Sequence, residues 1–185
     1  MATFIIEHLD CKLWKWCLIE YKHISKIVGK GKLLFTNIKN KQLGKYGKRN
    51  SKSISELNLK NACILDPDAK KTLSPEEAKK FKYFIFGGIL GDYPPKKRTK
   101  KELTKKLNFT ARNIGKKQFS TDNAVAVVKE ILKGKKLKDL KFKKKIEIQL
   151  GKYDSVILPY RYLLIKNKPL ISKELVEYLK RRKEF

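Results

Sequence analysis

The sequence predicts an α/β domain with a mostly parallel sheet and helices on both faces. Short apolar runs typical of strands alternate along the chain with longer segments whose apolar residues recur at the spacing of helices. The chain has 185 residues, of which 41% are hydrophobic, so it is long enough to bury a substantial core. It contains no internal repeat and no Pro/Ser-rich linker, and we therefore expect residues 1–185 to form a single domain.

The first third of the chain predicts two strands around one helix. Thr3–Glu7 (TFIIE) is a short apolar strand. Apolar residues recur at helical spacing within residues 13–28, and Gly29 then ends that helix. Residues 32–38 (KLLFTNI) are the second strand. The polar, basic stretch that follows predicts only a weak helix, near residues 53–59.

The middle third predicts two more strands and two helices. Residues 62–65 (ACIL) indicate a buried strand that ends in Asp-Pro-Asp. Ser74 begins the next helix, because the run Ser-Pro-Glu-Glu supplies an N-cap, a proline at the first helical position and a glutamate at the third. Residues 82–86 predict a strand that leads directly into glycines, and the basic segment 97–107 predicts a helix.

The last third predicts two helices and two strands. Ser120 or Thr121 caps a helix with an apolar stripe, which a glycine ends. Residues 145–150 (KIEIQL) and 155–158 (SVIL) look like strands. Ser172 caps the last helix, whose acids come early and whose lysines come late, as the helix dipole favours.

The strand that leads into glycines is the most informative stretch for function. It reads FIFGGILGD over residues 84–92, followed by two prolines and a basic run. Ligands of parallel sheets bind where the carboxyl ends of strands meet loops, and this stretch is such a place. The glycines do not match the GxGxxG dinucleotide pattern, and no Gly-Lys pair precedes Ser or Thr as a Walker A loop requires.

A nucleotide phosphate site is therefore disfavoured, and two readings remain open. One is a ligand with an apolar or aromatic body held by backbone groups in tight loops, and S-adenosylmethionine is a ligand of this kind. The other is a glycine-rich bulge or turn that binds nothing.

The charge of the chain indicates a polyanionic partner. Lys and Arg number 46 against 18 Asp and Glu, which gives a formal net charge of +28. A small domain with this charge repels itself unless it meets a polyanion, so RNA or the ribosome is the natural partner. The alternative is the lysine-rich composition of some proteomes, although that bias normally raises Glu as well.

Few residues suit a metal site or a disulfide framework. The three cysteines form no CxxC pair, and His8 and His23 are the only histidines, so we expect structural thiols and no metal. The apolar runs are far shorter than the ~20 residues of a membrane helix. The N-terminus has no signal-peptide pattern, and we expect a soluble, cytoplasmic protein.

Several stretches resemble one enzyme class. FIIEH, LIEYKHI, ACILDPDA, FGGILGDYPPKKRT, ARNIGKKQFSTDNAVAV and LPYRYL occur in family order over most of the chain. They resemble the SPOUT class of S-adenosylmethionine-dependent methyltransferases. More narrowly, they are similar to the branch catalogued as SAM-dependent RNA methyltransferase, which includes a fungal arginine methyltransferase of a small-subunit ribosomal protein.

The resemblance implies a deep trefoil knot over roughly residues 82–160, against the general rarity of knots. It also implies that S-adenosylmethionine sits bent among three loops, at residues 86–92, 112–120 and 157–160. The cofactor residues that it implies are Phe86, Gly87, Gly88, Ile89, Leu90, Gly91, Asp92, Arg112, Ile114, Gly115, Gln118, Phe119, Ser120, Leu158 and Pro159.

Two acids are the candidate catalytic residues. An arginine acceptor keeps its proton at ordinary pH, so carboxylates must bind and orient it. Asp92 and Glu7 each end a strand near the expected site. Relatives often carry an acid before the Leu-Pro or Met-Pro pair of the third loop, but this chain has Ile157 there, so no catalytic acid is expected at that position. The candidate nucleic-acid contacts are Lys96, Lys97, Arg98, Lys100 and Lys101.

Three functions are compatible with the sequence. The fungal relative favours methylation of an arginine in a small-subunit ribosomal protein. The net charge of +28 favours methylation of rRNA or tRNA. A non-catalytic RNA-binding or ribosome-assembly factor is the third. The resemblance is compatible with a monomer or with a homodimer formed through the knot.

Overall fold

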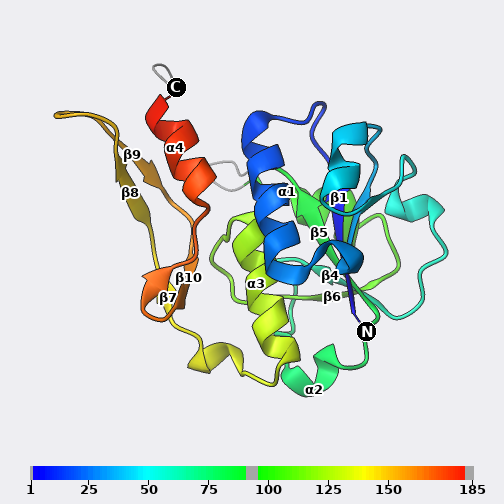
Figure 1. Cartoon of the computed structure of the whole chain (residues 1–185). Helices are drawn as coiled ribbons and strands as arrows, with labels where there is room; N and C mark the ends of the chain where they lie inside the picture. The colour runs from blue at the N-terminus through cyan, green and yellow to red at the C-terminus, as the bar shows by residue number, and fades with distance from the viewer. Residues whose placement is uncertain (1, 91–95, 182–185) are drawn as a thin grey trace.

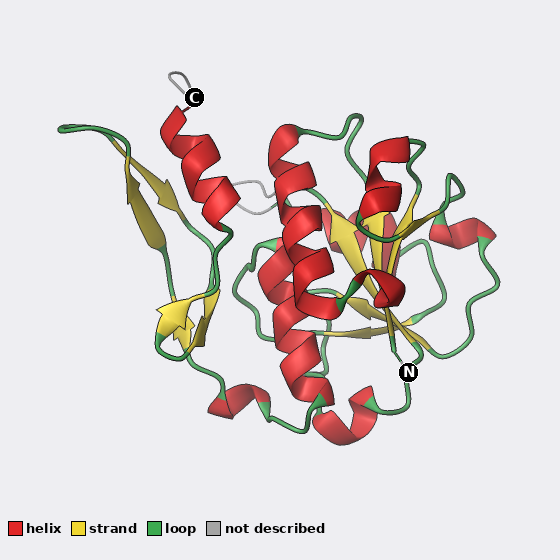
Figure 2. Ribbon diagram, viewed as in Figure 1, coloured by secondary structure: helices red, strands yellow, loops and turns green. Residues whose placement is uncertain are grey.

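The computed structural model describes residues 2–90 and 96–181. Its centre is a six-stranded sheet in the order β3-β2-β1-β5-β4-β6, and every neighbouring pair is parallel (Figures 1 and 2). The strands of this sheet are β1 (Thr3–His8), β2 (Leu33–Thr36), β3 (Lys48–Arg49), β4 (Ala62–Leu65), β5 (Tyr83–Gly88) and β6 (Thr110–Arg112). The predicted parallel α/β architecture is therefore confirmed.

The longest helices cover one face of the sheet. α1 (Lys15–Val28) and α3 (Thr121–Leu132) lie side by side across it (Figure 1). Phe4 and Ile6 of β1 pack with the buried residues of both helices, while Ile5 belongs to a separate cluster. This alternation follows from the two-residue period of strands, and it shows that both faces of the sheet are buried.

The other face of the sheet is covered by short helical turns and loops. Ile54 of η3 (Ile54–Glu56) and Leu103 of η4 (Lys100–Thr104) pack there against Ile5, Ile64 and Ile85. The predicted helix near residues 53–59 is thus a single turn, and the predicted helix 97–107 is shorter than expected. Helical elements lie on both faces, as predicted, but only one face carries long helices.

The C-terminal part forms a second, smaller group of elements beside α1. Its strands are mostly antiparallel and lie apart from the main sheet (Figures 1 and 2). Leu158, Leu175 and Leu179 pack there with Ile19 of α1, which joins this group to the rest of the chain. The elements are β7 (Phe142–Lys143), β8 (Ile146–Gln149), β9 (Ser155–Leu158), β10 (Tyr162–Ile165), β11 (Lys168–Pro169) and α4 (Lys173–Arg181).

The remaining elements are short turns between the main ones. Ser74 caps α2, and its hydroxyl oxygen accepts a hydrogen bond from the backbone N–H of Glu77 at 3.2 Å, as the Ser-Pro-Glu-Glu run predicts. The bounds of these elements are η1 (Lys30–Lys32), η2 (Lys41–Lys45), α2 (Pro75–Ala78) and η5 (Leu137–Asp139).

Two expectations about the whole chain stay predictions. The strand order does not by itself specify how the chain threads, so the knot over residues 82–160 is not tested by it. The single domain over residues 1–185 is likewise untested. Within the described ranges, every helix is too short or too polar to cross a membrane.

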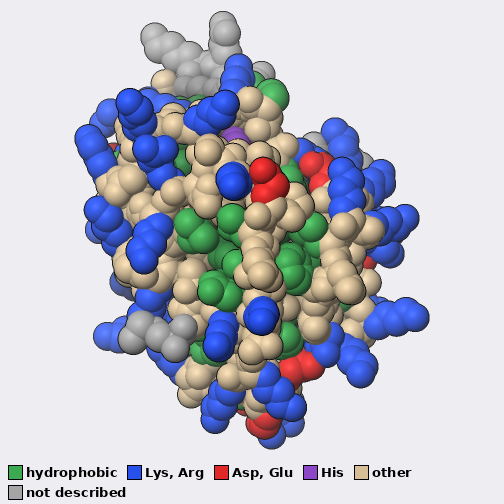
Figure 3. Space-filling view, turned by 90° about the vertical axis from the view of Figure 1, so that its right-hand side faces the viewer, with side chains coloured by type: hydrophobic (Ala, Val, Ile, Leu, Met, Phe, Trp, Pro, Cys, Tyr) green, Lys and Arg blue, Asp and Glu red, His purple; other side chains and the backbone are tan. Residues whose placement is uncertain are grey.

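The basic residues are widely distributed. Figure 3 shows one face of the molecule, on which Lys and Arg side chains stand at many separate points around a central group of hydrophobic side chains. Asp and Glu side chains are few on this face. The net charge of +28 is therefore not collected into one stripe there.

Candidate functional site

A cavity of about 410 Å³ opens at the carboxyl ends of β4 and β5. This position is the one at which parallel sheets bind ligands, and the volume lies in the ordinary range for small-molecule sites. Its walls come from α1, the loops after β4, β5 and β6, and the turn that leads into η4. The lining residues are Trp16, Glu20, Leu65, Asp66, Pro67, Asp68, Phe86, Gly87, Ile89, Lys96, Lys97, Arg98, Thr99, Lys100, Ile114, Gly115, Lys116, Gln118, Phe119, Ser120, Thr121, Ala124 and Tyr160.

Many of the residues predicted to bind the cofactor line this cavity. They come from the first and second predicted loops, and Tyr160 joins them from the third. The predicted residues on the cavity wall are Phe86, Gly87, Ile89, Ile114, Gly115, Gln118, Phe119 and Ser120. The described residues that do not line it are Gly88, Leu90, Arg112, Leu158 and Pro159. Gly91 and Asp92 lie outside the described residues.

The two adjacent glycines at the end of β5 have different surroundings. A side chain at Gly87 would meet the side chains of Ile89 and Thr99, which both line the cavity. A side chain at Gly88 would instead clash with the hydroxyl of Tyr21 in the core. Gly88 is therefore needed for packing between β5 and α1, and the expectation that it contacts the cofactor gains no support from this geometry.

The segment after β5 is fastened to the end of β1. The carboxylate of Asp10 accepts a hydrogen bond from the backbone N–H of Leu90 at 2.8 Å and pairs with Arg98 at 2.7 Å. Arg98 also donates to the backbone oxygen of Leu9 and to Glu102. Arg98 was predicted as a nucleic-acid contact, but these bonds give it a role in shaping the cavity wall.

The second loop is fastened to the loop after β4. Asn113 is buried, and its side-chain amide donates to the backbone oxygen of Ala69 at 2.9 Å. Its side-chain oxygen accepts hydrogen bonds from Thr72 and from the backbone N–H of Gly115. Gly115 itself has a φ of 103°, a conformation that favours glycine. This network sets the path of the chain along the cavity wall.

The second and third loops run side by side. The backbone N–H of Arg161 donates to the backbone oxygen of Gln118 at 2.9 Å, and the two segments form a parallel bridge at Phe119. The guanidinium of Arg161 lies over the rings of Phe119 and Phe142. These contacts explain why Tyr160, which follows a strand of the C-terminal group, reaches the cavity.

Two other predicted residues have structural partners away from the cavity wall. Arg112 forms a two-pronged ion pair with Glu77 of α2, through both Nε and Nη2. Leu158 is buried in the C-terminal group of elements. Arg112 and Leu158 hold the loops in place without lining the cavity.

Glu7, one of the two predicted catalytic acids, is almost fully buried at 1% exposure. Its carboxylate accepts hydrogen bonds from the hydroxyl of Ser53 at 2.6 Å and from the backbone N–H of Ile54 at 3.2 Å. Both carboxylate oxygens thus hold the start of η3, and Glu7 does not line the cavity. The geometry therefore supports a structural role for Glu7 in place of the predicted catalytic one.

The charged residues of the cavity are arranged by depth. Glu20 and Asp66 are buried, at 7% and 2% exposure. Lys96, Lys97 and Lys116 are exposed at the cavity mouth. The interior is therefore acidic, although the molecule as a whole is strongly basic.

Sequence reasoning missed the acids and aromatics contributed by two segments. The Asp-Pro-Asp run after β4 could have been assigned, because its strand ends beside the glycine loop in a parallel sheet. Trp16 and Glu20 could not, because their helical spacing shows only that α1 is amphipathic. Which residues of α1 reach the cavity depends on the packing of α1 against α3.

The cavity suits a ligand with a flat aromatic body and a polar end. Leu65, Phe86, Ile89 and Ile114 supply apolar surface, and Gly87 leaves backbone accessible beside them. Among the described residues, no three His, Cys, Asp or Glu side chains converge in the manner of a metal site.

Comparison with known proteins gives a consistent match. Residues 3–184 match the family model described as protein arginine N-methyltransferase SFM1-like. The chain is 34% identical over 200 residues to the protein arginine N-methyltransferase SFM1 of Saccharomyces cerevisiae, covering 96% of this chain and 94% of that protein.

Solved structures agree with this match. The crystal structure of the yeast arginine methyltransferase SFM1 complexed with SAM is similar at a TM-score of 0.87 and 31% identity, over 97% of this chain and 90% of that one. The dual-specific Trm10 from Thermococcus kodakaraensis has a TM-score of 0.56 at 19% identity, over 75% of this chain and 96% of that one. The second likeness concerns the fold alone.

Proposed function

The chain belongs to the SFM1-like family of protein arginine N-methyltransferases, and on this premise we propose that it methylates an arginine of a small-subunit ribosomal protein. It is an S-adenosylmethionine-dependent methyltransferase with a fold similar to that of SPOUT enzymes. The ribosomal substrate rests on the resemblance to the fungal branch and on the charge of the chain, which suits a ribonucleoprotein partner.

The residues that would hold S-adenosylmethionine are those of the cavity wall. Phe86 and Ile114 offer apolar surface for the adenine, and Gly87 and Gly115 allow close approach of the backbone. The bound cofactor supplies a methyl group on a positively charged sulfur. The protein's own contribution is to hold the acceptor nitrogen close to that methyl group and in line with the bond that breaks.

The observation that carries the proposal is the acidic interior of the cavity. Glu20 and Asp66 are buried in it, and Asp68 lines it with a side chain that is 29% exposed. A guanidinium group is attracted to buried carboxylates, which bind it with charge-assisted hydrogen bonds. The phosphate backbone of RNA would be repelled by the same groups at the point where its base must enter.

A second candidate, methylation of rRNA or tRNA, draws on a different observation. Lys96, Lys97, Lys100 and Lys116 surround the cavity mouth, and such residues could guide a nucleic acid toward it. Lysines at the mouth also suit a protein substrate that is embedded in ribosomal RNA, so they agree with both candidates. The acids inside the cavity agree with only one.

One experiment separates these functions. Small ribosomal subunits that lack the modification are incubated with the protein and tritium-labelled S-adenosylmethionine, and protein and RNA are then separated and counted. We expect the label in the protein fraction, as methylarginine after acid hydrolysis. Label in RNA alone would overturn the proposal, and absence of label from both fractions would favour the assembly factor. The expected monomer or knot-mediated homodimer stays a prediction for light scattering to test.

A further inference from the structure

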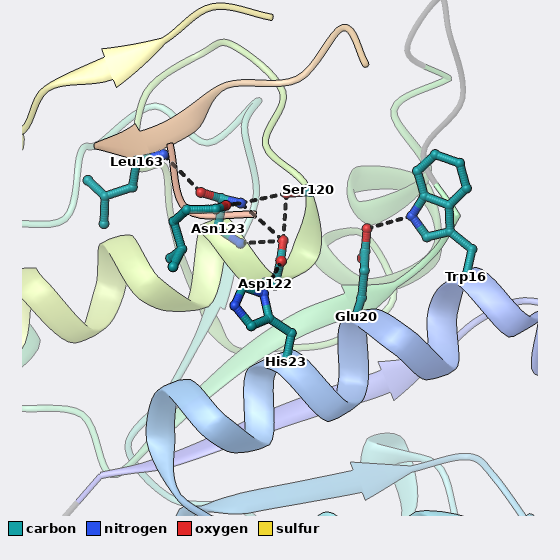
Figure 4. Close-up of polar contacts among 8 residues, drawn as sticks. Trp16, Glu20, His23, Ser120, Asp122, Asn123 and Leu163 are labelled. Carbon is teal, nitrogen blue, oxygen red and sulfur yellow. Dashed lines mark hydrogen bonds and ion pairs between the residues drawn. The ribbon is translucent and has the colours of Figure 1, made fainter. Parts of the chain in front are cut away.

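Glu20 of α1 is placed unusually for a glutamate. Its side chain is 7% exposed and lines the cavity. One carboxylate oxygen accepts a hydrogen bond from the indole N–H of Trp16, one helical turn earlier, at 2.9 Å (Figure 4). Figure 4 shows the side chains of Glu20 and His23 both rising from α1 toward the N-terminal end of α3. The indole therefore fixes one oxygen, at the place where the cavity wall and α3 meet.

Glu20 has no basic partner among the described residues, whereas Asp122 and Glu130 each have at least one. Asp122 has His23 at 2.6 Å, and Glu130 has Lys133 and Lys135 at 2.6 Å each. Glu7 is satisfied by a hydroxyl and a backbone N–H. Among the described residues, no Lys, Arg or His forms an ion pair with Glu20, although an unpaired buried carboxylate is costly.

The surroundings of Glu20 make it a stronger base than an ordinary glutamate. Burial and the nearby negative charge of Asp122 raise the pKa of Glu20 to about 8, against the opposing effect of hydrogen bonds from Trp16 and Thr121. Asp122 is itself locked by His23, the hydroxyl of Ser120 and the backbone N–H of Asn123 (Figure 4). The charge that acts on Glu20 is therefore held in one position.

We propose that Glu20 binds the guanidinium group of the acceptor arginine and takes up the proton that methyl transfer releases. This inference rests on the proposed function, because it requires an arginine acceptor. It adds a residue that neither the loop pattern nor the two predicted acids included. An incoming guanidinium would supply the cation that Glu20 lacks.

The bonds and charges of the step balance. A guanidinium nitrogen of the acceptor forms a bond to the methyl carbon, and the bond from that carbon to sulfur breaks with its electron pair left on sulfur. The sulfonium becomes a neutral thioether. One N–H proton passes to a carboxylate oxygen of Glu20, so the methylated guanidinium keeps a single positive charge. A carboxylate whose pKa lies near the working pH is well matched to this task.

The other acids of the cavity fit this role less well. Asp66 accepts a hydrogen bond from the backbone N–H of Asp68 with one oxygen and from the hydroxyl of Thr104 with the other, and these bonds help to fix the loop after β4. Asp68 is partly exposed and has Lys97 at 4.0 Å. Asp66 and Asp68 lie on the loop after β4, where they can help to hold a cation in the cavity.

The test uses the indole of Trp16 as a reporter beside the carboxylate. The chain has two tryptophans, so an amide-and-indole NMR spectrum of ¹⁵N-labelled protein shows two indole signals, which Trp14→Phe assigns. With S-adenosylhomocysteine bound, Nα-acetyl-arginine methylamide should shift the Trp16 signal, and its citrulline counterpart should not. The affinity for the arginine compound should increase as pH rises from 6 to 8, since binding requires the carboxylate form.

Other titratable groups face Glu20, so variants must isolate its contribution. They are Cys17, Tyr21 and His23 on α1, Asp122 on α3, and Tyr162 on β10. Lys96, Lys97, Arg98, Lys100 and Lys116 line the same cavity. Glu20→Gln keeps the size and removes the charge. The matched control is Glu174→Gln, which removes an acid that pairs with Lys22, two residues further along α1.

In Glu20→Gln we expect the single-turnover rate to fall by ~10²-fold or more. The selectivity for arginine over citrulline should be lost, while the affinity for S-adenosylhomocysteine stays within about twofold. Glu174→Gln should match the wild type in rate, in selectivity and in affinity for S-adenosylhomocysteine.

The outcomes separate this inference from the proposed function. If the wild type labels protein arginine and Glu20→Gln does so at the same rate, the role of Glu20 is wrong and the proposed function stands. If the wild type labels only RNA, both are overturned. The inference is also contradicted if the arginine compound leaves the chemical shift of the Trp16 indole unchanged in the wild type. This outcome requires no variant of Glu20.

Discussion

Arg98 and Asp10 form an ion pair at 2.7 Å that joins the segment after β5 to the end of β1. The second oxygen of Asp10 accepts the backbone N–H of Leu90. A side chain that the basic run suggested as a nucleic-acid contact thus helps to close the cavity wall. The arrangement gives a direct test of whether this wall must be rigid for the cofactor to bind.

The first prediction concerns this ion pair. Arg98→Leu should lower the free energy of unfolding by ~1–3 kcal/mol, because it leaves the 9%-exposed carboxylate of Asp10 without its cation. It should weaken S-adenosylhomocysteine binding by about tenfold or more, measured by calorimetry. Lys101→Leu is the control, because Lys101 is exposed and does not line the cavity. Equal affinities in the two variants would show that the wall does not depend on Arg98.

The second prediction separates two adjacent glycines. Gly88→Ala should reduce the thermal midpoint strongly, because the new methyl group clashes with the hydroxyl of Tyr21. Tyr21→Phe in the same chain should recover part of that loss, since it removes the oxygen. Gly87→Val should instead abolish the binding of S-adenosylhomocysteine, with a smaller effect on the midpoint of thermal unfolding. If Tyr21→Phe gives no recovery, the clash is not the cause.

The third prediction is a dependence of stability on pH. The pKa of Glu20 is about 8 in the folded protein and lies near 4.5 in the unfolded chain. Between these values the folded state binds more protons, so the contribution of Glu20 makes the protein less stable as pH rises from about 5 to 8. The free energies of unfolding of wild type and Glu20→Gln, measured by urea titration, should diverge over this pH range, with the variant relatively more stable at pH 8. If the two free energies change with pH in parallel, the pKa of Glu20 is not raised in the folded protein.

The fourth prediction concerns the lysines at the cavity mouth. Binding to small ribosomal subunits should weaken steeply with salt, because Lys side chains that bind phosphate release counterions. Replacing Lys97, Lys100 and Lys116 with Ala should reduce the slope of log binding constant against log salt concentration by about one for each phosphate that is no longer bound. Replacing three exposed lysines elsewhere, Lys30, Lys32 and Lys39, provides the control. If replacing the three lysines at the cavity mouth leaves the salt dependence of binding unchanged, other parts of the basic surface bind the ribosome.

The sequence predicted the backbone better than the chemistry of the cavity. Strands β1, β4 and β5 and helices α1 and α3 could be predicted because burial and capping leave a local periodic pattern. The short edge strands β3 and β6 could not, since two or three residues carry no period. The strands at residues 145–150 and 155–158 were found, but their antiparallel pairing apart from the main sheet was not.

The first two predicted loops supply much of the cavity wall, but the predicted residues do not include all of the residues that line the cavity. The glycine run and the second loop have turn chemistry that marks them in a sequence. In the sequence, Glu7 looks suitable as a catalytic acid and Gly88 as a cofactor contact. Only the packing shows that Glu7 holds η3 and that Gly88 faces Tyr21. Glu20 was missed for the converse reason, because an acid within an amphipathic helix gives no local sign that it will face a cavity.

The cavity is assembled from residues at both ends of the sequence, since Trp16 and Tyr160 share its wall. The main sheet is complete at residue 112, long before Tyr160 is reached. During synthesis, a chain still emerging from the ribosome can therefore pair its sheet while it has no finished binding site. The cavity would therefore be complete only after nearly the whole chain has left the ribosome.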